Sequence, residues 1–155
     1  MLVPHFYKQI YGTTIEDDNI TIISCNGVSY NNYLEILKGF PKKVAVITDN
    51  DKKITNIDKV KKYNESNNFT HIFMANDLEK EWTWEAAIYS ANKNVLDELI
   101  KVQDNSDYLF HGKDYGKTLG KMLNNKVETA YKMLLSEKKI TIPDYVKEAL
   151  EWIKE

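Results

Sequence analysis

Three short apolar runs, spaced about 25 residues apart and rich in β-branched residues, constrain the possible fold most. They are Ile20–Cys25, Val44–Thr48 and Thr70–Ala75, and none of them alternates cleanly between polar and apolar residues. Near-continuous apolar runs of this length are typical of strands covered on both faces, as in a parallel sheet. Segments with helical spacing lie between them. The order strand–helix–strand–helix–strand predicts βαβ units with right-handed crossovers.

Beyond Ala75 the pattern predicts helices only. Their expected ranges are 84–91, 95–102, 116–123, 126–135 and 145–153. A chain of 155 residues is long enough to bury a core without disulfides or a structural metal. We therefore expect a single α/β domain over residues 1–155, with a mostly parallel sheet flanked by helices over about 1–92 and a helical part over about 93–155.

Composition excludes several classes of protein. A formal net charge of −2 argues against a generic basic nucleic-acid coat, but not against an enzyme whose acidic site gains positive charge from a metal ion. No apolar run approaches the roughly 18 residues that a membrane span needs. Pro4 and His5 interrupt the place where a signal peptide would be continuously apolar. The only cysteine, Cys25, forms no disulfide framework, so we expect a reducing cytoplasm.

The strongest local signal for chemistry is the end of the second apolar run, where two carboxylates, Asp49 and Asp51, follow directly. The carboxyl ends of strands form the ligand crevice of an open α/β sheet. Mg²⁺ prefers oxygen ligands and is held by one or two carboxylates together with water and substrate phosphate. The sequence therefore predicts a divalent-metal site here. The alternative is that Asp-Asn-Asp is only a turn, since these residues favour turns.

A second acidic stretch follows the third run. Glu79 and Glu81 are expected to be solvated, whereas Glu85 begins an apolar helix, where a carboxylate needs a metal or a lysine as partner. The three histidines have no zinc-ligand spacing, and the sequence contains no phosphate-loop or serine-hydrolase motif. The acidic residues are therefore the candidates for chemistry.

In their order and spacing, these elements resemble the Toprim fold. More narrowly, they resemble the Toprim region of the overcoming-lysogenization-defect (OLD) family of ATP-dependent endonucleases. Residues 2–12 are similar to the latter part of that family's first Toprim helix, and 20–33 to its second strand and next helix. VAVITDND at 44–51 matches the Asp-x-Asp strand, and 82–85 resembles the Thr-x-Glu element. The tail, 125–153, matches the late Lys-containing helix and the closing helix.

The resemblance implies a Toprim-like, metal-dependent endonuclease that cleaves DNA phosphodiesters with Mg²⁺ or Mn²⁺ in a two-metal site. It assigns Asp49 and Asp51 to one ion and carries over Glu85 as a further carboxylate ligand. Lys126 matches the late Lys of the family and would offset charge on the phosphate. These four residues are the predicted catalytic set.

Other roles and partners also follow from the resemblance. Thr48 and Thr83 are expected to position phosphate or water, with an ordinary strand-end hydroxyl as the alternative. Gly27 is expected to permit close approach of the backbone at the crevice. The implied partners are DNA and, in a full-length relative, an upstream ATPase domain. No membrane is implied, and a homodimer stays open.

One departure separates the chain from the family pattern. Toprim domains begin with a Glu-Gly element that supplies a metal ligand or an acid–base group, and none of the 155 residues matches it. We therefore expect a fragment or truncated relative that is weak or inactive alone. Two other functions stay open: a catalytically inactive Toprim-like module that binds DNA or a partner, and a receiver-like flavodoxin fold with a phosphorylated strand-end Asp.

Overall fold

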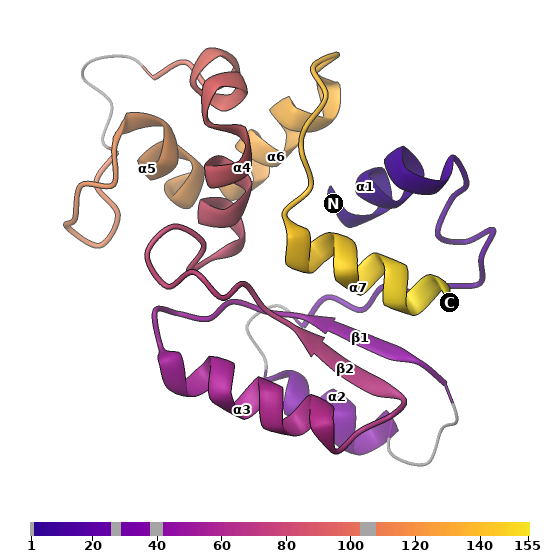
Figure 1. Cartoon of the computed structure of the whole chain (residues 1–155). Coiled ribbons are helices and arrows are strands. Elements are labelled where there is room, and N and C mark those ends of the chain that lie inside the picture. Colours follow the sequence, from indigo (N-terminus) through magenta and orange to yellow (C-terminus); the bar gives the residue numbers. More distant parts are fainter. Residues whose placement is uncertain (1, 26–28, 38–41, 103–107) are drawn as a thin grey trace.

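The structure is a computed structural model that describes residues 2–25, 29–37, 42–102 and 108–155. Gly27 lies outside these residues. Within them, the chain is a mixed α/β fold in which helices surround a small parallel sheet (Figure 1). In chain order the elements are α1 (Leu2–Tyr11), α2 (Tyr30–Leu37), β1 (Val44–Ile47), α3 (Ile54–Glu65), β2 (Thr70–Phe73), α4 (Trp84–Leu99), α5 (Lys117–Asn124), α6 (Lys126–Leu135) and α7 (Asp144–Lys154).

The sheet confirms two of the three predicted strands. β1 and β2 pair in parallel, with Val44 opposite Thr70 and Ile47 opposite Phe73. The crossover between them is α3, as the βαβ pattern predicts. The prediction of a strand at Ile20–Cys25 is wrong for the structure as described, because these residues have irregular backbone. Ile22 and Ile23 are about half exposed there, so β-branched residues without a covering layer did not form a strand.

Helices cover both faces of the sheet. α7 packs across β1 and β2 on one face, and α3 packs against β2 from the other, with α2 beside it (Figure 1). On the α7 face, the Trp152 ring stacks on His71 with 4.7 Å between ring centroids. On the α3 face, the Asn64 amide donates to the Ile72 carbonyl and accepts from its N–H at 2.8 and 2.9 Å. These contacts cover both faces of the sheet, as the near-continuous apolar runs predict.

Helices α4, α5 and α6 gather beyond the carboxyl edge of the sheet, whereas α1 lies beside α7 (Figure 1). The sequence predicts two helices over 84–91 and 95–102, whereas the structure has one helix, α4, with a kink at Asn92. The buried Asn92 side chain bonds to the Ile88 carbonyl and to both backbone groups of Thr141, which fixes α4 to the segment before α7. No helix in the described parts of the chain is long and apolar enough to cross a membrane.

One core joins the helical part to the sheet. Side chains from α1, α4, α5, α6 and α7 meet in a single buried cluster, and Ile47 and Phe73 of the strands pack against it. Because the last helix belongs to both the sheet layer and this core, it fixes the sheet relative to the helices. The division into a core at about 1–92 and a helical part at about 93–155 stays a prediction.

Candidate metal and phosphodiester site

The Asp49–Asp51 turn lies at the carboxyl end of β1. The last ladder contact is the Thr48 N–H, which donates to the Phe73 carbonyl at 3.1 Å. Asp51 and Lys52 then both take left-handed backbone conformations, with φ of 54° and 59°, which turn the chain sharply out of the sheet. As a result Asp49 and Asp51 line the same cavity, of about 150 Å³, together with Thr48. The other lining residues are Tyr30, Asn56, Lys59, Val60 and Met74.

Asn50 is the residue that sequence reasoning missed. Its side chain is fully buried, and its amide nitrogen donates to the carbonyls of Ala75, Asp77 and Glu81 at 2.9, 3.4 and 3.3 Å. Its side-chain oxygen accepts from the Lys52 N–H at 2.9 Å. The residue between the two aspartates therefore joins the turn to the loop after β2. The sequence showed only that this turn position holds an amide side chain, and other residues that favour turns could also form such a turn.

We expect Asn50→Ala to lower the free energy of unfolding by about 3 kcal/mol, because it leaves several buried backbone groups without a partner. Urea unfolding followed by circular dichroism measures the change. The matched control is Asn94→Ala, an exposed asparagine on α4, for which we expect a change within about 0.5 kcal/mol. Equal losses in the two variants would contradict the structural role of Asn50.

Asp49 is held in an environment that disfavours its charge. Its Oδ1 accepts a hydrogen bond from the Trp84 N–H at 2.8 Å, in the first turn of α4. Burial, with a further contribution from the negative charge of Glu85, raises the pKa of Asp49 from 3.8 to about 6, although this hydrogen bond and Lys126 act in the opposite direction. Burial thus outweighs the charge of Lys126. A bound divalent metal ion would add further positive charge and lower this pKa.

Glu85 and Lys126 form an ion pair at the same site. The Lys126 Nζ lies 3.1 Å from Glu85 Oε2, and the Glu85 side chain is only 10% exposed whereas that of Lys126 is 57% exposed. The preceding Thr83 caps α4 through its Oγ1, which accepts from the Ala86 N–H at 3.2 Å. This cap directs the first turn of α4 toward Asp49. The sequence predicts that Glu85 needs a metal or a lysine as partner, and in this structure the partner is a lysine.

The structure thus brings Asp49, Glu85 and Lys126 into electrostatic contact, and Asp51 shares the cavity of Asp49. In the described parts of the chain, no three His, Cys, Asp or Glu side chains are arranged to hold one metal ion. Thr83 is occupied as a helix cap, whereas Thr48 lines the cavity. These positions favour Thr48 over Thr83 as a group that faces a ligand.

Tyr145 also belongs to this site. It is buried at the start of α7, where burial and the negative charges of Asp49, Glu81 and Glu85 raise its pKa. Sequence patterns indicated only that it belongs to the closing helix. Packing of α7 on the sheet brings the phenol to the acidic residues.

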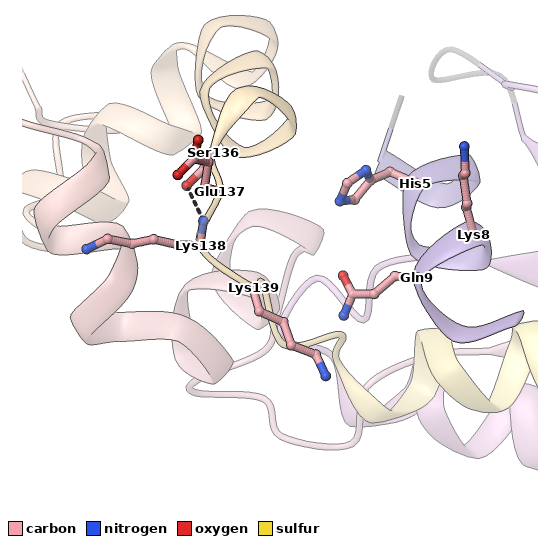
Figure 2. Close-up of a pocket in the computed structure, with 7 residues that line it drawn as sticks. All are labelled: His5, Lys8, Gln9, Ser136, Glu137, Lys138 and Lys139. Carbon is pink, nitrogen blue, oxygen red and sulfur yellow. Dashed lines mark hydrogen bonds between the residues drawn. The ribbon is translucent and has the colours of Figure 1, made fainter. Parts of the chain in front are cut away.

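A larger hollow, of about 320 Å³, lies elsewhere, between α1 and the segment that joins α6 to α7 (Figure 2). It is lined by His5, Lys8, Gln9, Ser136, Glu137, Lys138 and Lys139. Gln9 donates to the Ile140 carbonyl at 3.2 Å, which holds α1 against this segment. With one carboxylate among its lining residues, this hollow lacks the donor set for a magnesium site.

Comparison with known families bears on the acidic site. Residues 1–51, which end at Asp51, match the family model described as Overcoming lysogenization defect protein-like, TOPRIM domain. The Toprim resemblance is confirmed. The matched segment contains the Asp-x-Asp turn, while Glu85 and Lys126 lie beyond it. No curated protein matches the chain, and no solved structure does.

Proposed function

We propose that this chain is the metal-dependent DNA endonuclease module of an OLD-type Toprim protein. The observation that carries the proposal is that Asp49 and Asp51 line one cavity at the carboxyl end of a parallel strand. The Toprim match over the segment that ends with these aspartates supports the same function. DNA is the proposed substrate, and an ATPase domain is the proposed partner in a full-length relative.

The residues fit a divalent metal ion of the Mg²⁺ or Mn²⁺ type. Asp49 and Asp51 supply the one or two carboxylates with which Mg²⁺ is usually held, and both line one cavity. When bound, such ions polarise the phosphate and generate the attacking hydroxide from water. Asp49 and Asp51 would hold the ion. Glu85 is a third carboxylate, and its negative charge acts on Asp49.

Lys126 has two roles in this proposal. It pairs with the buried carboxylate of Glu85, and its mostly exposed side chain remains available to a phosphate at the site entrance. Tyr145 lies buried near the charges of Asp49 and Glu85. Thr48 faces the cavity and would orient the phosphate or a water molecule.

The test of the metal site is a Mg²⁺ titration followed by amide chemical shifts. We expect the amides of residues 48–52 and 83–85 to shift in the millimolar range, the weak affinity of a site that lacks a third free carboxylate. Asp51→Asn should reduce these shifts strongly. Asp58→Asn, on the exposed side of α3, is the control and should titrate like the wild type. Identical shifts in the wild type and Asp51→Asn would show that Asp51 does not bind the metal ion.

A passive Toprim-like module is the second candidate. The observation that favours it is the Glu85–Lys126 ion pair, which engages the third carboxylate in a contact within the protein. A passive module would bind DNA with the same affinity whether or not Asp49 is present, and would cleave none. Nicking of supercoiled plasmid by a longer polypeptide that carries a Glu-Gly element before residue 1, compared with and without Asp49, separates the two functions.

A further inference from the structure

An aromatic wall stands beside the acidic turn. It consists of Trp82, Phe110 and Tyr115, with ring centroids 5.2 Å apart for Trp82–Tyr115 and 6.4 Å for Trp82–Phe110. Trp82 is nearly buried, whereas Phe110 and Tyr115 are partly exposed. The wall is joined to the acidic turn by a backbone hydrogen bond of 3.1 Å, which the Asp51 N–H donates to the Trp82 carbonyl.

Lys52 places a positive charge on this wall. Its Nζ lies 5.0 Å from the Trp82 ring centroid and 5.4 Å from that of Tyr115, and it is 3.9 Å from the exposed carboxylate of Glu79. Lys52 is also the residue that follows Asp51 in the turn. A cation held over ring faces and next to a carboxylate cavity can bind a phosphate while the rings contact its nucleoside.

A tight hairpin extends the wall outward. Phe110 and Lys113 exchange two backbone hydrogen bonds of 3.0 Å, and the two residues between them, His111 and Gly112, have φ of 50° and 72°. Two successive left-handed residues are the signature of a type I′ turn. The turn leaves His111 exposed, with its ring 4.2 Å from that of Phe110. The hairpin thereby adds the His111 ring and a second lysine, Lys113, at the outer edge of the aromatic wall.

Packing against α5 fixes the wall in place. A Cβ at Gly120 would overlap the carbonyl oxygen of Tyr108, so glycine is what allows the chain before the hairpin to lie directly on α5. The carboxylate nearest the hairpin in sequence, Asp114, accepts from the Gly116 N–H at 2.7 Å. The aromatic surface is thus held rigidly beside the Asp49–Asp51 turn.

We propose that this wall seats an unpaired nucleobase of the DNA substrate, so that the substrate class is single-stranded or end-frayed DNA. The inference rests on the proposed DNA-cleaving function and specifies its substrate. A base stacks on the exposed ring surface of Tyr115, Phe110 and His111, and Lys52 binds the adjoining phosphate in place of Glu79. Paired bases in a duplex keep their faces covered and gain nothing from such a wall.

Binding measured without metal tests the inference independently of cleavage. The probes are a fluorescein-labelled oligo(dT), an abasic strand of the same length and charge, and a blunt duplex, followed by fluorescence anisotropy in EDTA. We expect wild type to bind oligo(dT) about tenfold more tightly than the abasic strand, in line with stacking of bases on aromatic side chains. Tyr115→Leu and His111→Ala should reduce that preference, and Lys52→Met should weaken binding of both single strands.

The chain offers matched controls at the opposite end of the sheet. Phe69→Leu alters an exposed aromatic residue just before β2, and Lys43→Met alters a lysine 5.1 Å above the Trp152 ring. Both should bind like the wild type, and circular dichroism should show that every variant is folded. His111 is exposed, so its variant keeps the test valid should Tyr115→Leu fail to fold.

Equal affinity of the wild type for oligo(dT) and the abasic strand would overturn the inference. It is overturned equally if the wall variants match their controls, or if the duplex binds as tightly as oligo(dT). Cleavage of plasmid by a longer polypeptide that carries a Glu-Gly element before residue 1, with no base preference in binding, would reject the wall and keep the nuclease. Base-dependent binding without any cleavage by that longer polypeptide would keep the wall and reject the nuclease.

Discussion

In a longer polypeptide that carries a Glu-Gly element before residue 1, Asp49→Ala is expected to abolish the nicking of supercoiled plasmid in Mn²⁺. The described residues contain no three-carboxylate metal set, so we expect the 155-residue chain alone to leave plasmid essentially intact. A longer polypeptide that carries a Glu-Gly element before residue 1 should nick it. In that polypeptide the alanine variant removes a carboxylate from the turn that would hold the metal. Gel electrophoresis of relaxed and supercoiled plasmid measures the loss.

The control for this experiment is Asp58→Ala, which removes an exposed carboxylate from α3 and should nick like the unchanged protein. Robust, Asp49-dependent nicking by the 155 residues alone would refute the need for a further carboxylate. Absence of nicking from the longer polypeptide with every metal tried would favour the passive module.

Asp49→Asn is expected to stabilise the metal-free protein by about 2 kcal/mol at pH 7.5. The pKa of Asp49 is about 6 in the folded protein, against 3.8 in the unfolded chain. The folded state therefore binds more protons between these values, and this group lowers stability as pH rises from about 4 to 6. Asparagine keeps an oxygen to accept the hydrogen bond of the Trp84 N–H but carries no charge. Urea unfolding at pH 4 and pH 7.5 measures the difference.

The stabilisation by Asp49→Asn should depend on pH. Below about pH 4 the wild type and Asp49→Asn should be equally stable, because both side chains are then neutral. Asp58→Asn, which removes an exposed carboxylate from α3, is the control and should leave the stability at pH 7.5 unchanged. Mg²⁺ at about 10 mM should raise the melting temperature of wild type and leave Asp49→Asn unchanged, because only a ligand that binds the folded state stabilises it. A less stable Asp49→Asn at pH 7.5 would show that the carboxylate serves structure.

Much of the fold could be predicted from local patterns. Two apolar runs became β1 and β2, and helical spacing located α5, α6 and α7 to within a few residues. The first run, Ile20–Cys25, carries the same pattern without a strand, because a strand needs a neighbour and cover that composition does not supply. The kink at Asn92 depends on hydrogen bonds to Thr141, which lies 49 residues away.

For the candidate site, the sequence by itself determined the position of Asp49 and Asp51, because a strand end followed by a turn is a local property. It also indicated that Glu85 needed a partner. Only the tertiary structure decided that this partner is Lys126, that Asn50 joins two loops, and that Lys52 lies over the aromatic wall. These contacts join residues 25 to 63 positions apart, and their strength depends on burial, which is set by how the helices pack.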